Sequence, residues 1–159
     1  HTYDPYFAPF DSYLMTLGLE TLSLRVRHEV ESARRLAEYC RNHPKVERVS
    51  FVGFESHPSY ANAKKYFRFG SSAVFTIELK GTLDSTVRFV ESLNLAAHMV
   101  MIGDSVTVVT HPASTTHKQL SDADLAAAGV TPTMLRISVG LENTDDLIDD
   151  FEQAFAHIG

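Results

Sequence analysis

The 159-residue sequence contains one cysteine, no tryptophan and no apolar run long enough to cross a membrane. The single cysteine, Cys40, excludes a disulfide within the chain and is typical of a reducing compartment, so we expect a cytoplasmic protein. A membrane-spanning helix needs about 18 or more consecutive apolar residues. The N-terminus, HTYDPYFAPF, lacks the charged and continuous apolar parts of a signal peptide, so we expect no membrane partner.

The charge balance argues against nucleic acid as a partner. The chain has 20 acidic and 14 basic residues, a formal net charge of −6, whereas phosphate binding needs clustered lysine and arginine. The length and the 44% hydrophobic content are those of one ordinary globular domain. Because the sequence begins with His1 rather than methionine, we expect it to be a piece of a longer protein.

Motifs for metal or nucleophilic chemistry are also missing. The sequence has no Gly-x-Ser-x-Gly elbow and no phosphate-binding Walker loop. His111 and His117 are six residues apart, which matches none of the compact metal-binding spacings, so we expect no metal site. Cys40 falls on an apolar helical stripe and Asp104 falls in a turn. We interpret the first as a core residue and the second as a group that bonds its own backbone.

Apolar residues spaced three and four apart predict the helices of the chain. The first is a long helix that starts at Pro9 and stops at Asn42-His43-Pro44, with an apolar stripe from Met15 to Cys40 and Gly18 as the candidate break. The second lies at 56–67, and the third follows Gly81-Thr82, with Leu83, Val87, Val90 and Leu93 inward. A short helix is capped by Ser121 and ended by Gly129, and the last begins at Asn143 or Thr144, with one apolar side from Leu147 to Ile158.

Alternating or continuous apolar runs predict five strands, at 46–53, 73–79, 99–102, 106–110 and 134–139. The resulting order of elements is α-β-α-β-α-β-β-α-β-α. Strands in which apolar and polar residues alternate are buried on one face. The sequence therefore predicts an α+β fold in which helices cover one face of a sheet of four to five strands and leave the other face open.

Arg136 is the single charged residue within the apolar run 134–139. A charged side chain at such a position needs a paired acid, an end that reaches solvent, or an anionic ligand. Its planar guanidinium can bind a carboxylate through two parallel hydrogen bonds. The pattern alone leaves a structural ion pair and a ligand contact equally open.

A series of short motifs in a fixed order resembles the C-terminal part of the Cys/Met-metabolism PLP-dependent enzymes, nearest to their O-acetylhomoserine sulfhydrylase, or homocysteine synthase, branch. The motifs are GLETL at 18–22, HPKV at 43–46, HPS at 57–59, AKKY at 63–66, GD at 103–104, HPASTTH at 111–117, GVTP at 129–132 and RISVGLE at 136–142. They cover nearly the whole chain from Ala8 onward, and their order is more specific than any one of them.

The resemblance implies a fold and a substrate site. In that family the C-terminal domain of the fold-type I enzyme is a small, mostly antiparallel sheet with helices on one side. The family's arginine before the S-V-G-L-E run binds the α-carboxylate of the amino-acid substrate, which implies this role for Arg136. The turn Met101-Ile102-Gly103 would line the pocket. It departs from the Ser-Leu-Gly of the lyase branch, and Val106 departs from the basic residue that sulfhydrylases often carry.

The resemblance also implies a missing part. In the family, the lysine that binds PLP lies upstream in a Ser-x-Thr-Lys-like context, together with the glycine loop for the phosphate. Five lysines are present here and none has that setting: Lys45, Lys64, Lys65, Lys80 and Lys118. We therefore expect residues 1–10 to be an extended lead-in, residues 11–159 to be one substrate-side domain, and an upstream PLP-binding domain to be its partner. We expect the chain alone to hold no catalytic residue and to bind no PLP.

For the parent protein, the resemblance implies a homo-oligomeric PLP-dependent transferase of methionine biosynthesis. It would exchange the acetate of an O-acetylhomoserine-like amino acid for sulfide or a thiol, giving homocysteine or methionine. Three alternatives stay open. They are a γ-lyase or γ-synthase of the same family, a stand-alone amino-acid-binding or regulatory α+β domain that uses the same arginine, and a structural oligomerisation domain.

Overall fold

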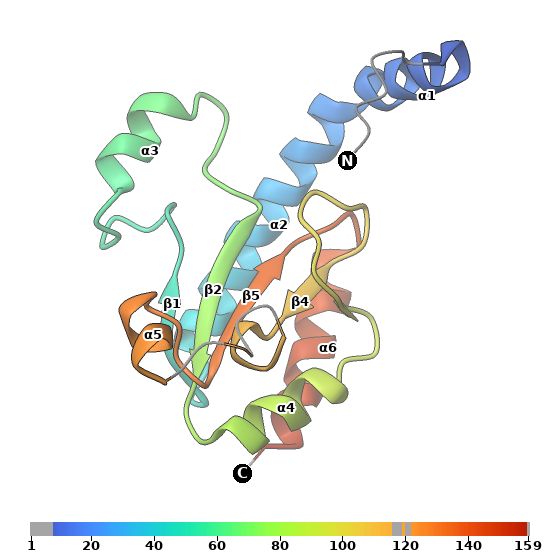
Figure 1. Ribbon diagram of the computed structural model, residues 1–159. Helices are drawn as coiled ribbons and strands as arrows, with labels where there is room; N and C mark the ends of the chain where they lie inside the picture. Colours follow the sequence, from blue (N-terminus) through green and yellow to red (C-terminus); the bar gives the residue numbers. More distant parts are fainter. Residues whose placement is uncertain (1–7, 116–118, 120–121, 159) are drawn as a thin grey trace.

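The computed structural model describes residues 8–115, 119 and 122–158 (Figure 1). In chain order its elements are α1 (Pro9–Glu20), α2 (Leu22–Asn42), β1 (Val46–Ser50), α3 (Tyr60–Tyr66), β2 (Val74–Leu79), α4 (Leu83–Glu91), β3 (Ala97–His98), β4 (Val108–Thr110), the 3-10 turn η1 (Pro112–Ser114), α5 (Asp122–Ala127), β5 (Met134–Ser138) and α6 (Thr144–Ala156). The predicted α+β class is confirmed.

The five strands form one sheet in the order β1-β2-β5-β4-β3. Neighbouring strands are antiparallel except β3 and β4, which are parallel. Along β2, Phe75, Ile77 and Leu79 are buried, whereas the residues between them are half-buried. The sheet therefore has one apolar face, as the alternation in the sequence predicts.

Helices α2, α4 and α6 cover that apolar face (Figure 1). The core contains side chains from both layers: Ala33, Leu36, Ala37 and Cys40 of α2, Phe89 and Val90 of α4, Leu147, Phe151, Ala154 and Phe155 of α6, and Phe75, Ile77, Val109, Leu135 and Ile137 of the sheet. Phe89 stands edge-on to Phe151 with ring centroids 5.5 Å apart, and its centroid lies 4.7 Å from that of Phe155. Such aromatic contacts add to the free energy gained by burial.

A buried carboxylate positions the chain just before β3. Asp150 of α6 is 6% exposed, and its oxygens accept the backbone N–H groups of Asn94 at 2.8 Å, Leu95 at 3.0 Å and Ala96 at 3.0 Å. Three N–H donors satisfy an anion that would otherwise be costly to bury. This cluster ties the turn after α4 to α6 and so sets where β3 begins.

The sequence predicts a break of the long N-terminal helix at Gly18. In the structure the break lies at Thr21. Thr21 has φ −107° and ψ 1°, which separates α1 from α2. The predicted apolar stripe is buried only from Ala33 onward, and its first members are exposed, including Met15 at 57% and Leu19 at 62%. The physical reason is that α1 and the start of α2 extend past the sheet, so no partner layer lies beneath them (Figure 1).

Residues 99–102 do not form the predicted strand. The strand in this region, β3, ends at His98. The carbonyl of Met99 accepts the hydroxyl of Thr110 at 2.7 Å, so a side chain takes the place of a ladder partner. Three other elements are shorter than predicted. The strand expected at 46–53 ends at Ser50, and the strand expected at 106–110 begins only at Val108. Successive turns delay the helix expected from 56 until Tyr60.

The inward face predicted for α4 agrees with the structure at Val90 and at Leu93 just after the helix, which lie in or against the core, and it differs at Leu83. Leu83 is 44% exposed, whereas Ser85 and Thr86 are buried together with Phe89 and Val90. The two small polar residues can be buried because both hydroxyls donate to the carbonyl of Thr82, at 2.8 and 3.0 Å. Thr82 is the N-cap of the helix, so its capping interactions decide which side turns inward.

The predictions for the C-terminal elements are confirmed where the structure describes them. Asn143 caps α6, because its side chain accepts the N–H of Asp145 at 2.8 Å. Gly129, with φ +71°, follows α5 in the left-handed region that favours glycine. The predicted cap Ser121 lies outside the described residues. In the described part of the chain, no helix combines the length and the apolar character needed to cross a bilayer.

His43 links the end of α2 to α6. Its ring stacks on Phe155 with centroids 3.9 Å apart, and its side chain is 9% exposed. Nδ1 accepts the N–H of Lys45 at 3.2 Å, which requires that nitrogen to be unprotonated. Burial lowers the pKa of His43, and the nearby Glu152 carboxylate offsets only part of this effect.

We predict that His43 makes the chain less stable below about pH 6.5, the pKa of an unfolded histidine. Because the folded pKa is lower, the unfolded state binds more protons in this range, and stability rises with pH. Thermal unfolding between pH 5.5 and 7.5 should show a steeper loss for the wild type than for His43→Phe, which keeps a stacked ring. His157→Gln, which changes an exposed histidine, should keep the wild-type slope. Equal slopes for wild type and His43→Phe would contradict the prediction.

Candidate functional site

Arg136 lies at the centre of the sheet, on the face opposite α2, α4 and α6. It is the middle residue of β5, between the inward-facing Leu135 and Ile137. Thr76 of β2 lies directly opposite it on one side and Thr110 of β4 on the other. Ser50 of β1 continues the same row next to Thr76. Strand alternation thus places one arginine in a row of hydroxyl groups across four strands.

The guanidinium of Arg136 is only partly satisfied by the protein. Nη2 donates to Thr110 Oγ1 at 3.4 Å, whereas Nε is buried and has no hydrogen-bond partner. Within the described residues, none of the ion pairs involves Arg136, and the acid nearby on this face, Glu78, is paired with Arg48. The structure therefore gives no support to the structural ion pair that the sequence left open.

An unpaired, buried N–H of a charged group is costly, so its presence points to an acceptor that comes from elsewhere. A carboxylate matches the guanidinium because its two oxygens can accept two parallel N–H groups. The row of hydroxyl groups offers further donors and acceptors around it. Arg136 is in this way equipped to bind and orient a carboxylate.

The run Ser138–Glu142, directly after Arg136, holds the segment 103–107 against the sheet. Ser138 Oγ accepts the N–H of Gly103 at 3.3 Å, and the N–H of Leu141 donates to Ser105 O at 2.8 Å. The carboxylate of Glu142 accepts both the N–H and the hydroxyl of Thr107, at 2.6 and 2.7 Å. The same strand that carries the arginine thus anchors the neighbouring loop.

Gly140 makes this close approach possible. A Cβ at this position would lie 2.5 Å from Ser105 O and Val106 C and 2.6 Å from Thr107 N, all of which are backbone atoms. Its own N–H donates to Thr107 Oγ1 at 2.9 Å. The S-V-G-L-E run is therefore a packing motif whose glycine admits a second backbone.

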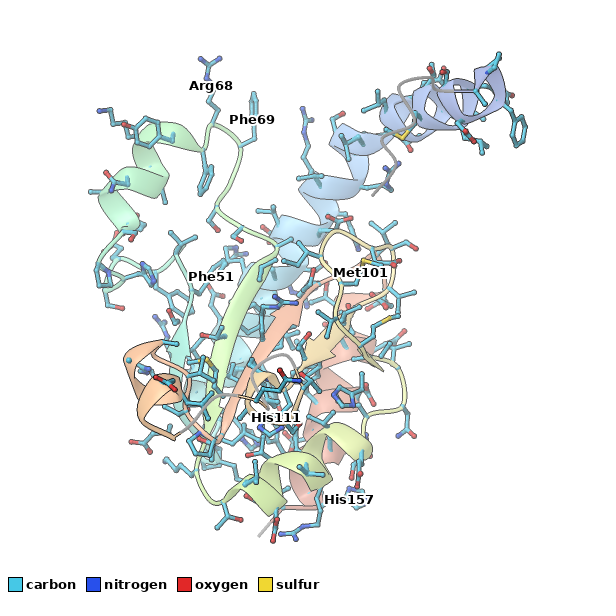
Figure 2. The ribbon with its side chains drawn as sticks, in the orientation of Figure 1. Phe51, Arg68, Phe69, Met101, His111 and His157 are labelled. Carbon is cyan, nitrogen blue, oxygen red and sulfur yellow. The ribbon has the colours of Figure 1, made fainter. Side chains whose placement is uncertain are left out.

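Met101, Ile102 and Gly103 lie in the loop between β3 and β4, which is anchored through Ser138 two residues from Arg136 (Figure 2). Gly103 has φ +76°, which suits the turn. The side chains of Met101 and Ile102 are 46% and 60% exposed. The structure thus brings the backbone of this loop to the strand of Arg136, and it leaves the two apolar side chains uncovered.

The residues interpreted as structural have structural roles where they are described. His111 is 1% exposed (Figure 2), with Nε2 at 2.9 Å from the carbonyl of Pro132 and Nδ1 at 2.8 Å from Ser114 Oγ. A carbonyl only accepts, so Nε2 donates its hydrogen to Pro132, and Nδ1 lies within hydrogen-bonding distance of the Ser114 hydroxyl. Both nitrogens are thus used within the protein. His117 lies outside the described residues. Among the residues that are described, no cluster of three or more histidine, cysteine or acidic side chains could hold a metal ion.

Cys40 and Asp104 likewise agree with their predicted roles. Cys40 is fully buried, and burial raises the pKa of its thiol. Asp104 accepts the N–H of Val106 at 3.3 Å, which is a turn contact within its own loop.

The described lysines do not approach the row around Arg136. Lys45 Nζ donates to the carbonyl of Phe155 at 2.7 Å, and Lys80 Nζ donates to that of Pro44 at 2.9 Å. Lys64 and Lys65 lie over the rings of tyrosines on α3. Lys118 lies outside the described residues. Each of these four described lysines thus already has a contact within the chain, and none of these contacts involves Arg136.

Sequence reasoning found Arg136 but not its neighbours Thr76 and Thr110. Both fall in runs predicted as strands, and period-two alternation puts Thr76 on the polar side of β2. The sequence does not give the register between paired strands. Only this register shows that both threonines lie opposite Arg136.

Comparisons with known proteins agree with this architecture. A family model described as Cys/Met metabolism PLP-dependent enzyme matches residues 2–156. The chain is 47% identical over 146 residues to a homocysteine synthase of Schizosaccharomyces pombe, covering 92% of this chain and 34% of that protein. It is 43% identical over 148 residues to O-acetyl-L-homoserine sulfhydrylase 1 of Thermus thermophilus, covering 93% and 35%. The chain thus spans about a third of the length of the curated relatives it matches.

A solved structure from Campylobacter jejuni, described as an O-acetylhomoserine (thiol)-lyase with N′-pyridoxyl-lysine-5′-monophosphate, has the same fold. The TM-score is 0.86 at 36% sequence identity, over 94% of this chain and 36% of that one. The mostly antiparallel sheet with helices on one face therefore corresponds to about a third of that longer protein.

We predict that Gly140→Ala destabilises the chain by about 1–3 kcal/mol, because the added methyl group would overlap backbone atoms that cannot move without breaking the contacts around Thr107. Urea unfolding would measure the change. The matched control is Gly18→Ala, where a Cβ meets no atom within 4 Å. There alanine should stabilise the helix by about 0.5–1 kcal/mol. The same effect at both positions would show that Gly140 is not needed for the close approach.

Proposed function

Because the chain belongs to the family of Cys/Met metabolism PLP-dependent enzymes, we propose that it is the C-terminal, substrate-side domain of a larger enzyme similar to O-acetylhomoserine sulfhydrylases. The parent enzyme exchanges the γ-acetoxy group of an O-acetylhomoserine-like amino acid for sulfide or a thiol. With sulfide the products are homocysteine and acetate, and with methanethiol they are methionine and acetate. A homo-oligomeric parent and a cytoplasmic location are part of this proposal.

The observation that carries the proposal is the buried, unpartnered Nε of Arg136 on the sheet face that the main helices leave open. In the proposed enzyme Arg136 binds the α-carboxylate of the substrate. The loop Met101-Ile102-Gly103 lines the pocket beside it, since Gly103 is anchored to Ser138 on the same strand. PLP, when bound by the parent, supplies an electron sink for the carbanion chemistry. The part of this chain is to bind and orient the amino acid.

The partner of this chain is an upstream domain that carries the PLP-binding lysine. In the proposal, residues 1–10 lead into the domain 11–159, and the upstream domain covers the open sheet face. The exposed apolar stripe of α1 and α2, from Met15 to Val26, is also available for contact. Large exposed apolar patches usually mark interaction surfaces.

A stand-alone amino-acid-binding or regulatory domain would use the same arginine without PLP. The two functions differ in whether the chain itself forms a covalent PLP adduct and in what it binds. A γ-lyase or γ-synthase of the same family would share Arg136 and differ in the group that leaves or is added, so product analysis separates these from the sulfhydrylase.

The first test is a PLP titration of the 159-residue chain, followed by borohydride reduction and intact-mass measurement. We expect no stable adduct, with circular dichroism showing a folded chain, because the described lysines contact other groups. One stoichiometric adduct on a single lysine would overturn the assignment of the cofactor to an upstream domain. Tight binding of a free amino acid by the isolated chain would favour the stand-alone domain.

We predict that Arg136→Ala in the full-length enzyme raises KM and lowers kcat/KM for the amino-acid substrate by about ten- to a hundredfold, since a charge-assisted hydrogen-bonded pair is lost. Arg136→Lys should recover part of the loss, because it restores the charge without the planar fork. Steady-state kinetics would measure both.

The control for this experiment is Arg48→Ala. Arg48 lies on the same face of the sheet but is 62% exposed and already paired with Glu78. Its removal should leave KM within about twofold of the wild type, as expected for an exposed ion pair. Unchanged kinetics in Arg136→Ala would remove the carboxylate role.

A further inference from the structure

We propose that Thr110 is a positioning residue that sets the guanidinium of Arg136 and the loop Met99–Gly103 in a fixed relation to each other. The inference rests on the proposed function, because it takes Arg136 as the group that binds the substrate carboxylate. It adds a residue that needs no contact with the substrate.

The first observation is the pattern of hydrogen bonds at the Thr110 hydroxyl. Its single hydrogen is donated to the carbonyl of Met99 at 2.7 Å. The oxygen must then act as an acceptor toward Arg136, whose Nη2 lies 3.4 Å away. The hydroxyl therefore presents a lone pair to the guanidinium and cannot compete with it as a donor for a carboxylate.

The second observation is that the Thr110 side chain cannot easily turn away from Arg136. Thr110 is 1% exposed, and it lies directly opposite Arg136 in the antiparallel pair of β4 and β5. Threonine is also stiff at χ1, because it is branched at Cβ. The sheet thus fixes the oxygen, and the oxygen restricts one end of a long side chain that would otherwise sample many rotamers.

The third observation is that hydroxyl groups from the same sheet face hold both ends of the loop. Thr110 binds the carbonyl of Met99, and Ser138 accepts the N–H of Gly103 at 3.3 Å. Between these anchors Val100, Met101 and Ile102 are 52%, 46% and 60% exposed. The loop therefore presents three apolar side chains from two fixed ends, and one of the two anchors also contacts the arginine.

Together these contacts connect the two sides of the proposed pocket. Loss of the Thr110 hydroxyl would release the guanidinium at Nη2 and the loop at Met99 in one step. A substrate would then have to order both groups when it binds, and this cost appears mainly in KM.

The test uses Thr110→Val in the full-length enzyme, because valine keeps the shape and removes the hydroxyl. We expect KM for the amino-acid substrate to rise by about three- to tenfold with kcat within about twofold of the wild type. Thr110→Ser should return KM to within about twofold, since the hydroxyl is restored. If Thr110→Val does not fold, Thr110→Ala should give the same rise in KM.

The matched control is Thr86→Val on α4. Thr86 is fully buried, and its hydroxyl donates to the carbonyl of Thr82, away from the sheet. The same chemical change there should lower the melting temperature and leave KM unchanged. A rise in KM for both valine variants would mean that general loss of stability explains the effect, and it would overturn the proposal.

A double-mutant cycle separates this inference from the proposed function. If Thr110 acts in part through Arg136, Thr110→Val should raise KM by a clearly smaller factor in an Arg136→Ala background than in the wild type, because only the release of the loop at Met99 remains. A full, independent effect in that background would overturn the inference. If Arg136→Ala raises KM but Thr110→Val does not, only the role of Thr110 fails. If Arg136→Ala itself leaves KM unchanged, the proposed function fails and this inference fails with it.

Discussion

The alternation of the central strands β2 and β5 is the constraint on which the rest of the structure depends. Phe75 and Ile77, paired with Ile137 and Leu135, turn to one side and require helices to cover them. The residues between them must then face the other side. Arg136 is on the open face because its two neighbours in sequence are needed in the core. One pattern therefore produces both the stability of the domain and its polar surface.

The open face would be of little use for binding if its parts could move independently. The structure prevents this with short polar contacts between backbone and side chains. Ser138 and Glu142 follow Arg136 on the same stretch of chain and hold the segment 103–107, and Gly140 allows the two backbones to meet. Asp150 fixes the turn before β3 from the other layer. The arginine and the loop beside it are thus positioned by groups that are satisfied within the protein, whereas the buried Nε of Arg136 has no hydrogen-bond partner among the described residues.

The sequence predicted the class, the order of the elements and Arg136, because these depend on periodicity and on residue type. It placed the break of the first helix at Gly18, whereas the backbone of Thr21, with φ −107° and ψ 1°, separates the two helices. The sequence also predicted a strand at 99–102, because apolar character alone does not distinguish a strand from an exposed loop. Around α4 the sequence correctly placed Val90 in the core and Leu93 against it, but Leu83 is exposed. Ser85 and Thr86 are buried instead, because their hydroxyls are satisfied locally. Thr110 was missed because register is a property of paired strands and not of one segment.

The exposed apolar residues follow from the same physics as the core. In Figure 1, α1 and the β3–β4 loop lie toward the same end of the molecule, beyond the layer that α2, α4 and α6 form with the sheet. Apolar side chains such as Leu19, at 62% exposed, and Ile102, at 60%, would gain free energy by leaving water. The chain spans about a third of the length of its relatives. In the enzyme that we propose, other parts of the parent protein cover this end. The unpaired N–H of the arginine and the uncovered apolar side chains of the loop then have the same explanation.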